Sequence, residues 1–115
     1  MLFSLIITFR NEGEQVYKTC SSFLKHCNND LFEIIVINDA SDDRFDYSNL
    51  ASLHNVKYIE NKDRMGVAGS RDLGAINATG KYILILDGHM RVFEDVLTRA
   101  ADIISNYPEE TLFCF

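Results

Sequence analysis

Four short polar clusters, at residues 8–12, 38–43, 60–64 and 87–89, each follow directly on an apolar run. If the apolar runs are parallel strands, their carboxyl ends meet at one edge of a sheet, which is where open α/β sheets bind ligands. A single polar cluster after a strand is ordinary loop composition. Four such clusters at one edge, carrying carboxylates, amides, guanidinium groups and an imidazole, predict a binding site.

Asp87 and His89 are the pair best suited to a metal ion. One glycine separates them, so both side chains can turn to the same side of a strand-end loop. A carboxylate with an imidazole suits a divalent cation such as Mn²⁺, and such an ion can neutralise a diphosphate. Gly88 would leave room for a ligand to approach the backbone. A turn residue beside a surface histidine is the alternative, and the residues alone leave both interpretations open.

Two common nucleotide-binding motifs are absent. Neither the G-x-G-x-x-G dinucleotide fingerprint nor a Walker P-loop follows the first apolar run. The sequence therefore lacks the main motif that would indicate a nicotinamide-dependent dehydrogenase or a P-loop ATPase.

Apolar runs and helical patterns alternate along the chain in a way that would bring the four clusters together. Residues 2–9 form a continuous apolar run, as expected for a strand buried on both faces. Apolar residues at helical spacing follow between Val16 and Cys27. The predicted strands are residues 2–9, 32–37, 56–59, 82–86 and 111–115; the predicted helices are residues 16–27, 66–78 and 96–107, with a short one at 47–53.

Local signals mark where these helices begin and end. Asn11 with Glu14 forms a capping-box pattern at the start of the first helix. The second helix is rich in Ala and Gly, which would let it approach a sheet closely, and Gly80 stands in a helix-terminating position. Pro108 would stop the last helix.

The strand–helix alternation predicts an α/β fold with a doubly wound, mostly parallel, Rossmann-like sheet. A chain of 115 residues is long enough for one domain and too short for two. A parallel sheet needs both faces covered, yet no helix follows the apolar run at 111–115. We therefore expect the chain to be a truncated part of a larger domain.

Composition narrows the class of protein further. With 47% hydrophobic and 24% charged residues, the chain is typical of a globular protein rather than a disordered one. The net charge of −6 argues against a nucleic-acid partner. Three unpatterned cysteines and the lack of a secretory signal favour a cytoplasmic location, and no run approaches the ~20 apolar residues of a membrane span.

Taken in order, these motifs resemble the nucleotide-binding half of a GT-A-fold glycosyltransferase, most of all family 2. The run Ser4 to Glu12 is similar to that family's first strand and Asn-Glu turn, and residues 33–43 to its second strand and acidic Asp-x-Ser-x-Asp loop. Residues 60–75 resemble its Asn…Gly…Ala-Arg-Asn-x-Gly stretch, with Asp72 in place of the usual Asn. The resemblance covers nearly the whole chain.

The resemblance implies transfer of a sugar from a UDP- or GDP-sugar donor to a saccharide, lipid or protein acceptor. It implies that Thr8 and Glu12 line the base and ribose pocket and that Asp39 accepts a hydrogen bond from the base. Arg64 and Arg71 are the candidates for contacts to the diphosphate, whose geometry a guanidinium group matches. No nucleic-acid partner is implied, and peripheral association with a membrane face is compatible with such acceptors.

The metal motif carries the main departure from the family pattern. Asp87-Gly88-His89 stands where family 2 has Asp-x-Asp, and the resemblance implies that Asp87 and His89 hold Mn²⁺ or Mg²⁺ on the diphosphate, with Asp87 also part of the nucleotide site. The Asp-x-His form is also similar to the polypeptide N-acetylgalactosaminyltransferases. Those enzymes retain the anomeric configuration and family 2 enzymes invert it, so the stereochemical outcome stays open.

No catalytic base is assigned within the chain. An inverting transfer needs a base for the acceptor hydroxyl, and the resemblance implies that it lies beyond residue 115. The acids after the metal motif fall on the last predicted helix or its flanks and are expected to be solvated. We therefore expect residues 1–115 to be the donor-binding part of a single GT-A domain, without the acceptor part and inactive alone.

Three other classes of protein share parts of this pattern. A sugar nucleotidyltransferase would need a glycine-rich phosphate loop after the first strand, where this chain has Arg10, Asn11 and Glu12. A receiver domain would need an acidic pair there and a lysine after the fifth strand, and neither is present. A non-catalytic nucleotide-binding α/β module stays open, and metal dependence would distinguish it.

Overall fold

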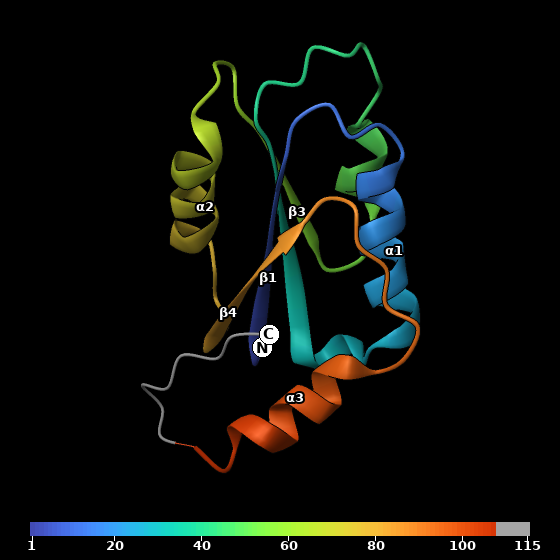
Figure 1. Ribbon diagram of the computed structural model, residues 1–115, viewed down its shortest axis with the longest axis vertical. Helices are drawn as coiled ribbons and strands as arrows, with labels where there is room; N and C mark the ends of the chain where they lie inside the picture. Colours follow the sequence, from blue (N-terminus) through green and yellow to red (C-terminus); the bar gives the residue numbers. More distant parts are fainter. Residues whose placement is uncertain (108–115) are drawn as a thin grey trace.

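The computed structural model describes residues 1–107 and has a four-stranded, fully parallel sheet in the order β3-β2-β1-β4. Helix α1 lies on one side of the sheet and α2 on the other (Figure 1). This arrangement confirms the predicted Rossmann-like α/β class. The elements are β1 (Phe3–Phe9), α1 (Gln15–His26), β2 (Phe32–Asn38), β3 (Val56–Glu60), α2 (Gly66–Ile76), β4 (Tyr82–Asp87) and α3 (Val96–Ile104), with 3-10 turns at Asn29–Leu31 and Ser48–Ser52.

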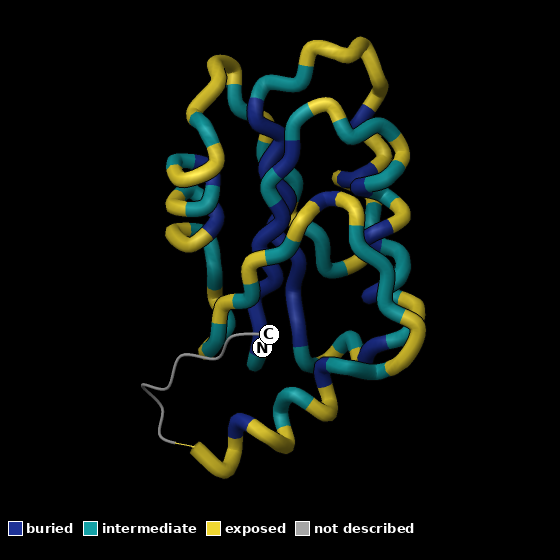
Figure 2. Tube along the Cα trace, in the orientation of Figure 1, coloured by how far each residue is buried: buried dark blue, intermediate teal, exposed yellow. Residues whose placement is uncertain are grey.

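The two central strands form the core of the sheet. All of β2 is buried, and β1 is buried except at Thr8, which explains their continuous apolar sequences because both faces are covered. Buried residues accordingly concentrate in these strands (Figure 2). Residues Leu5, Ile7 and Phe9 of β1 pack with Val16 and other residues of α1 in one hydrophobic cluster.

The register of the strands brings the predicted polar clusters to one edge. Phe9 is paired with Asn38, Asn38 with Glu60, and Thr8 with Asp87. All four strands therefore end at nearly the same level, and the loops that follow them share one end of the sheet.

Helix α2 approaches β1 closely, as its small residues predict. A Cβ atom placed on Gly74 would lie 2.5 Å from Cγ2 of Ile6, which is far inside van der Waals contact. The end of this helix differs from the prediction, because it ends at Ile76 rather than at residue 78. Gly80 instead passes against β1, where a Cβ would lie 2.6 Å from the backbone of Phe3 and Ser4.

The predicted capping box at Asn11 is wrong. Helix α1 begins at Gln15, and the residue before it, Glu14, makes no capping hydrogen bond with its side chain. Asn11 has a positive φ of 59° and exchanges two hydrogen bonds with Asp42, each 2.9 Å long. The loop after β1 is thus bonded to the loop after β2, and this contact takes the side chain away from the helix.

Helix α3 is the last element among the described residues, which end at residue 107. This helix ends at Ile104, three residues before the predicted end. Pro108, Cys114 and the strand predicted at 111–115 lie outside the described residues. Within residues 1–107, no helix is long and apolar enough to cross a membrane. Cys20 and Cys27 are free thiols, and burial raises the pKa of Cys20 to about 12.

Candidate functional site

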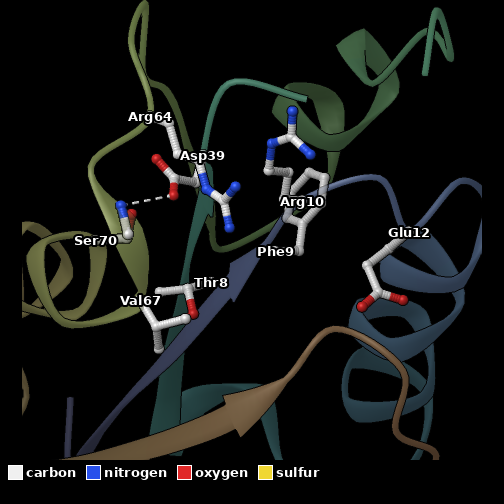
Figure 3. A pocket seen from close by; sticks show the side chains of 9 residues that line it. Thr8, Phe9, Arg10, Glu12, Asp39, Arg64, Val67 and Ser70 are labelled. Atoms are coloured by element: carbon white, nitrogen blue, oxygen red, sulfur yellow. Dashed lines mark hydrogen bonds between the residues drawn. The ribbon is translucent and has the colours of Figure 1, made fainter. Parts of the chain in front are cut away.

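A cavity of about 180 Å³ lies at the carboxyl ends of β1 and β2, beside the start of α2. Asp39, Arg64 and Ser70 lie on one side of it and Glu12 on the other, with Thr8 between them at the end of β1 (Figure 3). The cavity is lined by Thr8, Phe9, Arg10, Glu12, Asp39, Arg64, Gly66, Val67 and Ser70. Four of the six predicted nucleotide-binding residues, Thr8, Glu12, Asp39 and Arg64, are therefore brought together.

Asp39 is the most buried charged group of the cavity, with 6% of its surface exposed. Its Oδ1 accepts hydrogen bonds from the Met65 amide at 2.7 Å and from Nδ2 of Asn61 at 3.1 Å. Its Oδ2 accepts one from the Gly66 amide at 2.9 Å. Burial alone would raise the pKa of Asp39, but these three hydrogen bonds and the charge of Arg64 outweigh it and hold the pKa below its ordinary value.

Asp39 also holds the N-terminus of α2. Met65, the residue before this helix, has no side-chain capping bond of its own, so the carboxylate of Asp39 accepts from the first free amides instead. A carboxylate has about four acceptor positions, and three are occupied by the protein. Sequence patterns missed this contact because the partners are separated by 26 and 27 residues along the chain.

Arg10 was not predicted as a site residue, and the structure places it in the lining of the cavity. Its guanidinium group forms an ion pair with Asp42, 2.8 Å from Nη2 to Oδ2. Its Nε is buried and has no hydrogen-bond partner among the described residues. A buried donor without a partner is costly, so an acceptor on a bound ligand would be favourable here. The position of Arg10 directly after β1 was the available signal.

Arg64 and Arg71 occupy different positions. Arg64 is exposed and lines the cavity, whereas Arg71 lies on α2 and is not among the lining residues. Nε of Arg71 is nevertheless buried and has no hydrogen-bond partner among residues 1–107. Ser70, which was not predicted, is fully buried and accepts a hydrogen bond from Nδ2 of Asn61 at 3.3 Å. It joins the start of α2 to the same network as Asp39.

Asp87 and His89 lie at the end of β4 and are both exposed, outside the lining of the cavity. Nδ1 of His89 is 3.2 Å from Oε1 of Glu12, which connects the metal motif to the cavity wall. Gly88 packs closely against the protein itself, and room for a ligand at its backbone stays a prediction. A Cβ there would lie 3.1 Å from Cβ of Phe9 and 3.4 Å from Cγ of Glu12, so the protein itself fills that space.

Asp87 and His89 fit a divalent ion in donor type. The carboxylate of Asp87 has no hydrogen-bond or ion-pair partner within the described part of the chain and is free to coordinate. A hydrogen bond from Nδ1 of His89 to Glu12 would leave a lone pair on Nε2. No group of three His, Cys, Asp or Glu residues that could hold a metal occurs among residues 1–107, so further ligands would have to come from a diphosphate, from water or from outside this range.

The amino-acid sequence is similar to known glycosyltransferases. A sequence model of glycosyl transferase family 2 matches residues 4–114. Polypeptide N-acetylgalactosaminyltransferase 14 of Homo sapiens is 38% identical over 96 residues, which cover 82% of this chain and 17% of that protein. N-acetylgalactosaminyltransferase 7 of Drosophila melanogaster is also 38% identical over 96 residues, with 77% of this chain and 16% of that protein covered. The chain thus spans about a sixth of the length of these relatives.

Solved structures show the same fold. A crystal structure of TarS from S. aureus in complex with UDP-GlcNAc superposes with a TM-score of 0.79 at 23% sequence identity. The match covers 91% of this chain and 31% of that chain.

Proposed function

This chain belongs to glycosyl transferase family 2, and we propose that the protein carrying it transfers a sugar from a UDP- or GDP-sugar to an acceptor. In such a transfer, the bond between the sugar and the diphosphate breaks and a bond to an acceptor oxygen forms. The oxygen's proton passes to a base that we place outside this chain, together with the acceptor site. We propose a saccharide, lipid or protein as acceptor; the cytoplasmic location remains a prediction.

The cavity at the ends of β1 and β2 carries this proposal. It combines a buried, ionised Asp39 with the guanidinium groups of Arg10 and Arg64. A carboxylate accepts from the ring N–H of a uracil or guanine base. Guanidinium groups suit the oxygens of ribose and phosphate. The crystal structure of TarS with UDP-GlcNAc supports a nucleotide-sugar donor for this fold.

The size of the cavity supports the binding of part of a nucleotide. Its volume of about 180 Å³ is below the ~300–1,000 Å³ of typical small-molecule sites. We therefore place the base in the cavity, against Thr8 and Asp39, and the ribose toward Glu12. The diphosphate would extend toward the end of β4, where Asp87 and His89 stand. Arg71 stays a candidate for a phosphate contact.

A metal ion is part of the proposal. Asp87 and His89 would hold Mn²⁺ or Mg²⁺, which supplies charge neutralisation to the leaving nucleoside diphosphate. Two residues of the site also act by position: Asp39 fixes the start of α2, and Glu12 orients the imidazole of His89 through the 3.2 Å contact.

Calorimetric titration of the whole protein with UDP, GDP, CDP and ADP, with and without Mn²⁺, tests this function. We expect UDP or GDP to bind, and Mn²⁺ to strengthen the binding. Failure of all four nucleotides to bind in a metal-dependent way would contradict the transferase proposal. Binding that ignores Mn²⁺ would favour the alternative, a non-catalytic nucleotide-binding module.

A further inference from the structure

A row of polar residues on α1 contacts the segment that follows β4. Gln15, Thr19 and Ser22 are spaced four and three residues apart, so they lie on one face of the helix. The segment 88–92 runs along α1 (Figure 1), and each of the three residues bonds to it. This polar face lies beside the apolar stripe of the helix. Hydrophobic packing therefore does not account for its polar side chains.

Thr19 makes the central contacts. It is fully buried, and its hydroxyl oxygen accepts a hydrogen bond from the Met90 amide at 2.9 Å. The same hydroxyl lies 3.0 Å from the Gly88 carbonyl, to which it donates; the Gln15 carbonyl, also at 3.0 Å, competes for that proton. One buried hydroxyl therefore holds the backbone on both sides of His89.

Two further residues, Arg91 and Val92, fix the segment beyond Met90. The guanidinium group of Arg91 donates to Oε1 of Gln15 at 2.7 Å and to the Thr19 hydroxyl at 3.2 Å. The amide of Val92 donates to the Ser22 hydroxyl at 3.2 Å. The segment is thus held along its length by α1, and Thr19 is the contact closest to His89.

The position of His89 depends on this backbone. Gly88 passes so close to β1 that even a Cβ atom would lie 3.1 Å from Phe9, and the imidazole of His89 reaches Glu12 at 3.2 Å. Glu12 therefore orients the imidazole ring, but His89 itself is exposed, so the packing of its side chain does little to place its backbone. The position of the His89 backbone is therefore set by the contacts at Gly88 and Met90.

We propose that Thr19 is a positioning residue of the donor site, which holds residues 88–90 so that Asp87 and His89 are presented to the metal ion and the diphosphate. This inference rests on the proposed function. Thr19 itself touches neither ligand. It acts through the backbone of the metal motif, as groups behind metal ligands commonly do.

The test compares three variants of the whole protein. Thr19→Val removes the hydroxyl and keeps the shape, and Thr19→Ser keeps the hydroxyl. Thr79→Val is the matched control, because the Thr79 hydroxyl also bonds to a buried group, Oε1 of Glu33 at 2.9 Å, at the opposite edge of the sheet. Thr19→Ala is a second way to remove the hydroxyl should the valine variant not fold.

Two measurements are made on each variant. The first is hydrogen exchange of the Met90 amide without metal, which we expect to be slow in the wild type and in Thr19→Ser and fast in Thr19→Val. The second is titration with and without Mn²⁺ of whichever nucleotide the wild type binds, UDP or GDP (written UDP below). We expect Thr19→Val to lose about 10- to 100-fold of the Mn²⁺-dependent affinity, as changes behind a metal ligand do, with metal-free UDP affinity unchanged and Thr19→Ser at the wild-type level.

The outcomes separate this inference from the proposed function. A wild-type protein that binds neither UDP nor GDP in a Mn²⁺-dependent way contradicts the proposed function. A wild-type protein that binds UDP with Mn²⁺, together with a Thr19→Val or Thr19→Ala variant that behaves like Thr79→Val, overturns the inference alone. Rapid exchange of the Met90 amide in the wild type would also overturn it.

Discussion

At the scale of single residues, Asp39 combines two tasks. Its carboxylate accepts from the Met65 and Gly66 amides and so holds the start of α2, and it lines the cavity in which we place the base. The two tasks are compatible because three of about four acceptor positions are used by the protein. A change at Asp39 should therefore affect both binding and stability.

Asp39→Asn tests this double role. An amide can no longer accept on both sides, so we expect UDP affinity to fall about tenfold with or without Mn²⁺, and the unfolding free energy to fall by about 1–3 kcal/mol. Calorimetry and urea unfolding measure the two effects. Asp63→Asn, at an exposed position in the loop before α2, is the control and should change neither. Loss of affinity only in the presence of Mn²⁺ would argue against contact with the base.

Asp87→Ala should affect only metal-dependent binding, unlike Asp39→Asn, which should affect both metal-independent binding and stability. The Asp87 carboxylate is exposed and has no partner among the described residues, so its removal should leave stability unchanged. We expect UDP affinity to drop to the metal-free value and to stop responding to Mn²⁺, because one of the two proposed ligands is lost. Asp72→Ala, an exposed acid on α2, is the matched control in the same titration. A variant that still responds fully to Mn²⁺ would remove Asp87 from the metal site.

At the scale of elements, α2 is positioned from both of its ends. Asp39 holds its first amides, and at its other end Gly74 allows contact with Ile6 of β1. Beyond the helix, the carboxylate of Glu33 accepts hydrogen bonds from the Thr79 amide at 2.7 Å and the Ser4 hydroxyl at 2.8 Å. Helix α2 forms one wall of the cavity. Its distance from the sheet is therefore fixed by its packing on β1 rather than by the loop that precedes the helix.

Two alanine substitutions within α2 test this packing. Gly74→Ala would place a Cβ 2.5 Å from Ile6, which is buried and cannot move away, so we expect a loss of about 1–3 kcal/mol in unfolding free energy. In Gly69→Ala the new atom meets the side chain of Met65 at 3.3 Å. The nearest atom is Cβ of Met65, which precedes the helix and is exposed, so a shift of a few tenths of an ångström relieves the contact; helix propensity should then dominate, and stability should stay equal or rise by up to ~1 kcal/mol. Equal losses in the two variants would contradict the close approach of α2.

At the scale of the whole molecule, buried carboxylates connect stability to pH. Burial alone would raise the pKa of Glu33, but the hydrogen bonds from Thr79 and Ser4 and the charge of Lys57 lower it below its ordinary value of 4.5. The pKa of Asp39 is lowered in the same way from 3.8. A carboxyl with a lowered folded-state pKa stabilises the fold above its unfolded pKa and loses this contribution as pH falls through the folded one.

We therefore expect the unfolding free energy to be constant above about pH 5. It should fall as the pH drops below the ordinary pKa values of Glu33 and Asp39. Urea unfolding between pH 7 and pH 3 measures it. Glu33→Gln should lower stability at neutral pH and reduce the acid-dependent loss. Glu14→Gln, at an exposed helix pair with Lys18, should leave the profile unchanged. A wild-type protein that is more stable in acid would contradict the assigned direction.

The amino-acid sequence by itself determined the fold class and the edge at which the site lies. Continuous apolar runs such as that of β2 indicate burial on both faces, and four strand-sized segments separated by helical patterns allow few arrangements other than a parallel sheet. Parallel strands end at one edge, so Thr8, Glu12, Asp39 and Arg64 could be grouped from their order alone. The family resemblance was carried by the same motifs.

Only the tertiary structure decided which side chains share contacts, because those partners are far apart in the chain. Asn11 bonds to Asp42 rather than to its own helix, and Asp39 holds a helix that begins 27 residues later. Gly80 and Gly88 lie against β1 and the loop that follows it, and Gly80 does not end a helix. Thr19 meets residues 88–90 across 69 positions or more. Local sequence patterns predict the conformation of residues that are close together in the chain. These contacts instead depend on the distance between the sheet and the helices packed on it.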